Sequence, residues 1–153
     1  MPNSKPYILV SSCILGNRTR YDGASKKNSN VNKLYEYFTI IPICPEVDGG
    51  LLIPRDPCEI VGDKIISVNG KDCTKEYKSG AEKSLNLALK YKVKYAVLKE
   101  SSPSCGVHNI HDGKFSGEKI PGQGITTELL SKNHIRVFSD EEIDILISLL
   151  KTN

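Results

Sequence analysis

The feature that most constrains this fold is a series of four short apolar runs separated by segments with helical periodicity. The runs lie at residues 7–11, 40–43, 95–99 and 135–138. They are rich in β-branched and other apolar residues without strict alternation, a pattern typical of central parallel strands covered on both faces. The runs therefore predict a mostly parallel sheet with a layer on each side.

Apolar residues recur at helical spacing in four further segments, at residues 31–38, 77–89, 125–130 and 140–151. The second segment is expected to begin near Asp72 or Thr74, both of which suit an N-cap. The last is expected to begin at Asp140, because Ser139 and Glu142 have the spacing of a capping box. Strands that alternate with helices in this way predict an α/β fold.

Two segments interrupt the alternation, and both have the signals of hairpins. Residues 59–73 contain Gly-Asp and Asn-Gly, and residues 109–117 centre on Asp-Gly, dipeptides that favour tight turns. The sequence contains no internal repeat, low-complexity segment or linker. We therefore predict one domain, residues 1–153, with a three-layer Rossmann-like fold, a mostly parallel central sheet and small hairpin insertions.

Composition and charge limit the classes of function. The chain is 39% hydrophobic and 25% charged, as in ordinary soluble globular proteins. A net charge of +3 permits an anionic ligand but argues against a nucleic-acid surface. No segment resembles a signal peptide or a membrane span, so we expect a cytoplasmic protein with no membrane partner. Its five cysteines would then stay reduced, which favours metal binding or catalysis over disulfides.

Three of the cysteines follow predicted strands. Cys13 lies just past the first run, Cys44 immediately past the second, and Cys105 a short loop past the third. Right-handed crossovers bring the carboxyl ends of parallel strands to one edge, where open α/β sheets form their sites. The three thiols are therefore expected to converge. Cys58 and Cys73 fall in the first hairpin segment and are expected to be packed residues.

Three converging thiols favour a soft metal centre. Structural zinc usually takes ligands in close pairs, and no C-x-x-C occurs in this chain, although a zinc-bound Cys₃ hydrolase stays an alternative. A [4Fe–4S] cluster accepts ligands that are dispersed in sequence, and three thiolates would leave one iron with an open position. His108 and His111, beside a Gly-rich turn, are more simply interpreted as solvated loop residues.

Groups that could transfer protons or contact a ligand flank these cysteines. Glu46 lies two residues after Cys44, and Ser102 lies shortly before Cys105. A carboxylate and a hydroxyl near a metal could act on a bound substrate. The arginines at positions 18, 20 and 55 could meet an anionic or carbonyl-bearing ligand, but each alone is more simply interpreted as a surface charge.

Four blocks of sequence carry a resemblance to a known family. They are SSCILGNRTRYDG (11–23), CPEVDGGLLIPR (44–55), KESSPSCG (99–106) and DGKFSGEKIPGQGITTELL (112–130). Together and in this order they resemble the signature blocks of the prokaryotic uncharacterised-domain family that includes thiouracil desulfidase. The resemblance runs over nearly the whole chain, and the combination of separate blocks makes it specific.

The resemblance implies an enzyme that desulfurises a thiolated small molecule such as 2-thiouracil without net redox change. It implies a [4Fe–4S] cluster bound by Cys13, Cys44 and Cys105, whose open iron accepts the substrate sulfur. Glu46 and Ser102 match the residues implied as acid/base or substrate-orienting groups. Thiolated tRNA stays open as a substrate, although the modest charge disfavours a large RNA partner, and the sequence indicates no oligomeric state.

Two departures from the family pattern and two alternative functions accompany this interpretation. Cys58 stands where related sequences usually carry a small non-thiol residue, and Val107-His108 replaces expected small residues, which affects the predicted pocket shape.

A non-catalytic iron–sulfur protein for electron transfer or sulfur trafficking would use the same cysteines. The segment after Cys13 also resembles a tyrosine phosphatase loop, but Thr19 stands where that loop requires arginine.

Overall fold

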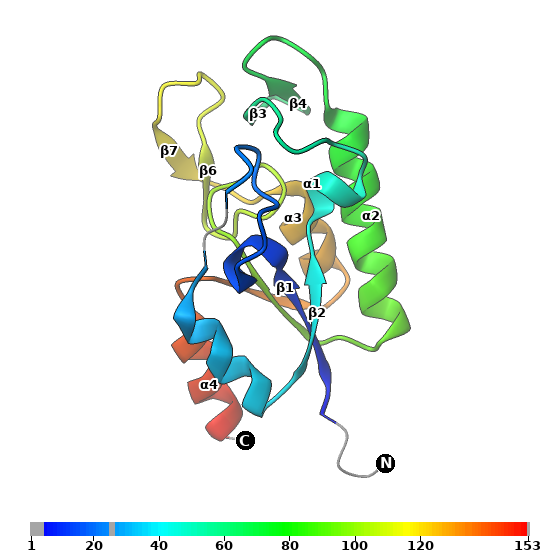
Figure 1. Ribbon diagram of the computed structural model, residues 1–153, viewed down its shortest axis with the longest axis vertical. Coiled ribbons are helices and arrows are strands. Elements are labelled where there is room, and N and C mark those ends of the chain that lie inside the picture. The colour runs from blue at the N-terminus through cyan, green and yellow to red at the C-terminus, as the bar shows by residue number, and fades with distance from the viewer. Residues whose placement is uncertain (1–4, 25–26, 153) are drawn as a thin grey trace.

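The centre of the molecule is a four-stranded parallel sheet (Figure 1). The computed structural model describes residues 5–24 and 27–152. In sheet order the strands are β2 (Thr39–Ile43), β1 (Tyr7–Ser11), β5 (Tyr95–Leu98) and β8 (Arg136–Ser139). Each strand end lies within one residue of the predicted run, and all the pairings in the sheet are parallel. The predicted sheet is confirmed.

Helices cover both faces of this sheet and give the predicted three layers. One face packs against η2 (Ser29–Glu36) and α4 (Ile143–Lys151), and the other against α2 (Thr74–Lys90) and α3 (Ile125–Lys132). Successive residues of β1 point to opposite faces, so Ile8 and Val10 join the first core and Leu9 the second. Burial on both faces explains the absence of strict alternation in the sequence.

Two of the expected helices differ from their predictions. The first is a 3₁₀ helix, in which the buried Val31 and Leu34 lie three residues apart on one side. The last begins at Ile143, three residues later than predicted. The Glu142 carboxylate does accept the backbone N–H of Ser139 at 2.9 Å, but residues 140–142 form a turn, since the Asp140 carboxylate is engaged by the backbone N–H of residue 100.

Both predicted hairpins are present beyond the carboxyl edge of the sheet (Figure 1). The first pairs β3 (Cys58–Val61) with β4 (Lys64–Ser67), and the second pairs β6 (Asn109–His111) with β7 (Lys119–Pro121). The Glu59 carboxylate joins them by accepting the backbone N–H of Gly113 at 2.9 Å. The hairpins thus stand together over the edge where the strands end.

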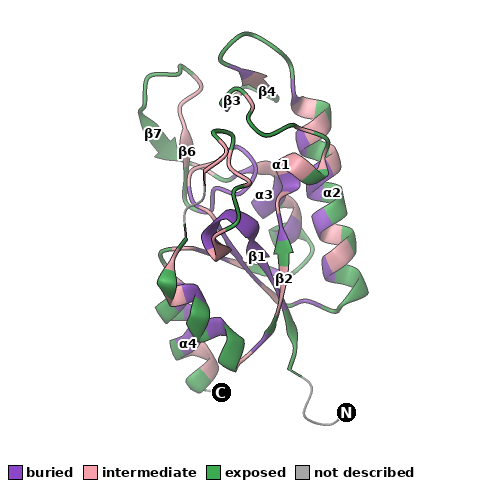
Figure 2. Cartoon of the chain, viewed as in Figure 1, coloured by how far each residue is buried: buried purple, intermediate pink, exposed green. Residues whose placement is uncertain are grey.

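Short helical turns follow the two strands that precede Cys13 and Cys44. η1 (Ser12–Leu15) follows β1, and α1 (Pro45–Asp48) follows β2. Figure 2 shows that buried residues extend from the sheet into the segments just beyond its carboxyl edge. Within the described ranges, no helix has the length and apolar character needed to cross a membrane.

Candidate active site

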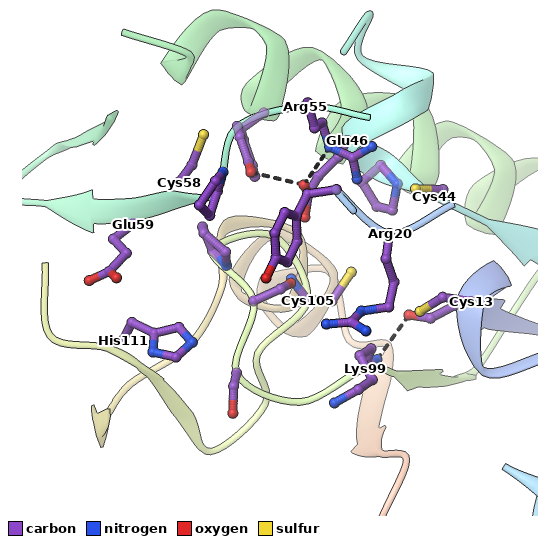
Figure 3. Close-up of a pocket in the computed structure, with 18 of the residues that line it drawn as sticks. Cys13, Arg20, Cys44, Glu46, Arg55, Cys58, Glu59, Lys99, Cys105 and His111 are labelled. Atoms are coloured by element: carbon purple, nitrogen blue, oxygen red, sulfur yellow. Dashed lines mark hydrogen bonds and ion pairs between the residues drawn. The ribbon is translucent and has the colours of Figure 1, made fainter. Parts of the chain in front are cut away.

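A cavity of about 570 Å³ lies between the carboxyl edge of the sheet and the two hairpins. All five predicted site residues line it: Cys13, Cys44, Glu46, Ser102 and Cys105. They come from segments that are far apart in sequence and meet only through the parallel topology (Figure 3). The three thiols therefore converge at this edge, as predicted.

Each of the three thiols is placed by the end of a strand. Cys13 lies in η1 directly after β1, Cys44 is the residue before α1, and Cys105 lies in the loop after β5. Cys13 and Cys105 are buried, and Cys44 is half-buried. All three are free thiols. Their different strands explain why no local motif such as C-x-x-C occurs.

The protein environment raises the pKa of all three thiols. Burial, followed by the nearby Cys44, raises the pKa of Cys13 to about 11, although Lys99 and Arg20 act in the opposite direction. Burial and the Glu46 carboxylate raise the pKa of Cys105 to about 12, and Cys44 adds to this effect. Burial also raises the pKa of Cys44. Three thiolates in this cavity would need a bound cationic group.

The cavity's donor set includes thiols from three segments of the chain. Thiolates that converge on one cavity match the ligands that iron–sulfur clusters take in proteins. In the part of the chain that the structure describes, no three His, Cys, Asp or Glu side chains are grouped closely enough to bind one metal ion.

Glu46 lies on α1, which is packed tightly on α2. A Cβ on Gly49 would fall on the carbonyl oxygen of Glu76, and a Cβ on Gly80 would fall on that of Pro45. The two glycines therefore allow the backbones of the two helices to touch. This contact fixes the position of α1, which carries Glu46, relative to α2.

Two side chains bind the Glu46 carboxylate at the same oxygen. Arg55 Nε donates to Oε1 at 3.1 Å, and the Tyr77 hydroxyl donates to Oε1 at 3.0 Å. Arg55 and Glu46 are largely buried, with 9% and 15% of their side chains exposed, so the ion pair is shielded from water. Figure 3 shows the bond from Arg55 to the Glu46 carboxylate in the cavity wall.

The loop that carries Cys105 is organised by two side chains. The Ser102 hydroxyl oxygen accepts the backbone N–H of Cys105 at 2.7 Å, which fixes the turn around Pro103. The buried Glu100 carboxylate accepts four backbone N–H groups at the two ends of this loop, those of Ser101, Val107, His108 and Asn109. The strand therefore delivers Cys105 in a defined loop.

Positive charges gather on one side of the cavity. The Arg20 guanidinium and the Lys99 ammonium both lie near Cys13 in Figure 3. Arg55 also lines the cavity, whereas Arg18 is absent from its lining among the described residues. Of the three arginines considered as contacts for a ligand, Arg20 and Arg55 therefore reach the site. Lys99 was missed, although it begins the KESSPSCG block.

The remaining cysteines and histidines divide between the core and the cavity. Cys58 and Cys73 are both buried in one small cluster with Tyr77, as expected for packed residues, and Cys58 also borders the cavity. His108 is exposed and pairs with Glu142 at 2.8 Å, as expected of a loop residue. His111 is different, because it lines the cavity and its Nδ1 is buried without a partner in the described chain.

Comparisons with known proteins agree with these features. The profile of the 2-thiouracil desulfurase family matches residues 8–142. A Bacillus subtilis (strain 168) protein, described as uncharacterized protein YbbK, is 40% identical over 147 residues, which is 90% of this chain and 97% of the relative. A solved structure, described as the [4Fe-4S]-dependent thiouracil desulfidase TudS, is 40% identical, with a TM-score of 0.91 over 97% of this chain and 100% of that one.

Proposed function

Because this chain belongs to the 2-thiouracil desulfurase family, we propose that it removes the sulfur of a thiolated small molecule such as 2-thiouracil, using a [4Fe–4S] cluster bound by Cys13, Cys44 and Cys105. The observation that carries the proposal is the meeting of three thiols, a carboxylate and a serine hydroxyl in one cavity. The similarity to a solved structure described as a [4Fe-4S]-dependent thiouracil desulfidase supports it. The overall change is hydrolysis, in which a C=S group and water give a C=O group and hydrogen sulfide.

The three cysteines would hold the cluster, and the cavity above them would hold the substrate. When bound, a cluster with three cysteine ligands supplies an iron with an open position, a soft Lewis acid towards a thiocarbonyl sulfur. The cavity of about 570 Å³ has room for more than the cluster. The charges of Lys99 and Arg20 on the Cys13 side would offset the negative charge that three thiolates bring.

Glu46 would act as the general base of this hydrolysis. Its carboxylate faces the cavity, with Oε1 held by two donors and neither donor bound to Oε2. Oε2 is thus available to accept a proton from the water that attacks the thiocarbonyl carbon. The same group can return the proton to the departing sulfur, so the protons balance within one turnover.

Ser102 would orient the heterocycle. Its oxygen already accepts the N–H of Cys105, which leaves the hydroxyl proton free to be donated to a ring nitrogen or carbonyl. A donor placed in this way stabilises the negative charge that develops on the ring during attack. One side chain would thus link the geometry of a ligand cysteine to the orientation of the substrate.

The experiment that tests the proposal follows sulfide and uracil release from 2-thiouracil by anaerobically reconstituted protein. We expect both products in equal amounts from the native chain, and roughly 100-fold slower release from Glu46→Gln with its iron content unchanged. Glu36→Gln, on the 3₁₀ helix η2, is the matched control. A cluster-bearing protein that releases sulfide neither from thiolated pyrimidines nor from thiolated tRNA would instead favour the non-catalytic iron–sulfur alternative.

A further inference from the structure

In the cavity wall, two side-chain donors hold one oxygen of Glu46. Arg55 and Tyr77 come from different segments and donate to Oε1 at 3.1 and 3.0 Å, and neither donates to Oε2. Two hydrogen bonds to Oε1 restrict the rotation of the carboxylate. Its second oxygen therefore keeps a fixed direction relative to α1.

Tyr77 can only act as a donor in this arrangement. It is 2% exposed, and burial together with the adjacent Glu46 charge raises the pKa of its hydroxyl well above the ordinary range. The hydroxyl hence stays protonated at neutral pH. A permanent neutral donor aimed at an ionised acceptor forms a strong hydrogen bond without adding a charge to the site.

Arg55 supplies the second donor and ties it to the ligand loops. Besides Glu46, its guanidinium donates to the carbonyl oxygens of Leu52 at 3.1 Å and Thr19 at 2.9 Å. The Thr19 carbonyl also accepts the Cys44 thiol at 3.7 Å. Replacement of Arg55 would therefore disturb several segments, whereas removal of the Tyr77 hydroxyl deletes its bond to Glu46 and its contact with the Cys58 thiol.

The position of Tyr77 on its helix makes the contact rigid. Tyr77 lies three residues before Gly80, whose backbone touches Pro45 directly. Glu46 follows Pro45, so the residue that donates and the residue that accepts are carried by two helices in direct backbone contact. The backbones that carry the two side chains are therefore fixed relative to each other.

We propose that Tyr77 is a positioning residue for the reaction: with Arg55 it ties Oε1 of Glu46 to the protein and so presents Oε2 to the substrate. This inference rests on the proposed function, in which Glu46 touches the attacking water. It assigns a role to a residue whose helical spacing alone indicates core packing. The hydroxyl would act through Glu46 and not on the substrate.

The test compares native enzyme with Tyr77→Phe, both loaded anaerobically with the cluster, using 2-thiouracil as substrate. We expect kcat to fall about tenfold, with KM and iron content unchanged, because the carboxylate samples unproductive orientations. In a Glu46→Gln background the same change should leave the residual rate unaltered. Tyr35→Phe, at an exposed position on η2, is the matched control.

An unchanged kcat in Tyr77→Phe, or an equal fall in the Glu46→Gln background, would overturn the inference while native activity still supports the proposed function. Native enzyme without activity would instead count against the function itself. Arg55→Lys gives a second measurement if Tyr77→Phe fails to fold. Lysine keeps the charge but cannot make all the bonds of the planar guanidinium, so kcat should again fall, and a native kcat at native iron content would contradict the proposed fixing of Oε1.

Discussion

Gly80 on α2 lies against the carbonyl oxygen of Pro45 on α1 with no room for a side chain between them. The contact matters because Pro45 stands between Cys44, a predicted ligand, and Glu46, the proposed base. A small change on α2 is therefore expected to reach the site through the backbone.

Gly80→Ala should destabilise the protein although alanine is the better helix former. The gain in helix propensity is about 1 kcal/mol, but the added methyl group meets backbone that cannot move like a side chain. Overpacking typically costs ~1–3 kcal/mol, and a clash with backbone atoms belongs at the upper end of this range, so we expect a net loss of about 2 kcal/mol in the free energy of unfolding. Urea denaturation measures it.

Asn86→Ala is the matched control for Gly80→Ala. Asn86 is exposed on the same helix, so alanine there raises helix propensity without a clash, and stability should rise slightly or stay constant. If Gly80→Ala were as stable as native and kept full sulfide release, the contact would not set the position of Glu46.

Much of this architecture could be predicted from the sequence because the relevant signals are local. The strands were found to within one residue since a fully buried parallel strand has a continuous apolar run. Cys13, Cys44 and Cys105 could be brought together because right-handed crossovers leave few arrangements of strand ends. The start of α4 was wrong because residues 140–142 form a turn in which the Asp140 carboxylate accepts the backbone N–H of Glu100, a contact between distant segments that a capping pattern does not reveal.

Tertiary contacts explain the rest of what was missed. Tyr77 has the helical spacing of a core residue, and its core packing is real, so only the docking of α1 on α2 reveals its bond to Glu46. His111 enters the cavity because its hairpin folds back over the sheet edge. Neither placement leaves a signal in the residues that flank it.

Glu100→Gln should loosen the Cys105 loop. The Glu100 carboxylate is buried and accepts four backbone N–H groups, and an amide in its place loses the charge that strengthens these bonds. We expect a loss of about 2 kcal/mol in unfolding free energy. Hydrogen exchange at the amides of Val107 and Asn109 should accelerate, whereas exchange within β8 should stay as in the native protein if the effect is confined to the loop.

The contribution of Glu100 should disappear in acid. Burial opposes its ionisation, but the four backbone N–H groups outweigh burial and hold the pKa of the carboxyl below its usual range. A lowered pKa stabilises the fold above the unfolded value, about 4.3, and this stability is lost as pH falls through the folded pKa. The stability difference between native and Glu100→Gln, measured on metal-free protein, should be constant above pH ~5 and shrink below it. A difference that grew in acid would contradict this.

Ser102→Ala should slow turnover more than it weakens the fold. The variant loses both the acceptor for the Cys105 N–H and the donor proposed to face the heterocycle. Loss of such a donor lowers kcat by about 100-fold in comparable sites. Ser102→Thr keeps the hydroxyl and should retain most of the activity, so equal defects in the two variants would count against a role for the hydroxyl.

The central claim, that Cys13, Cys44 and Cys105 bind one [4Fe–4S] cluster, is tested most directly by counting iron and acid-labile sulfide after anaerobic reconstitution of native protein and five single Cys→Ala variants. Native protein, Cys58→Ala and Cys73→Ala should each hold about four irons and four sulfides per chain, the composition of such a cluster. Variants at positions 13, 44 and 105 should lose most of both. A full cluster in Cys105→Ala, or its loss in Cys58→Ala, would contradict the ligand assignment.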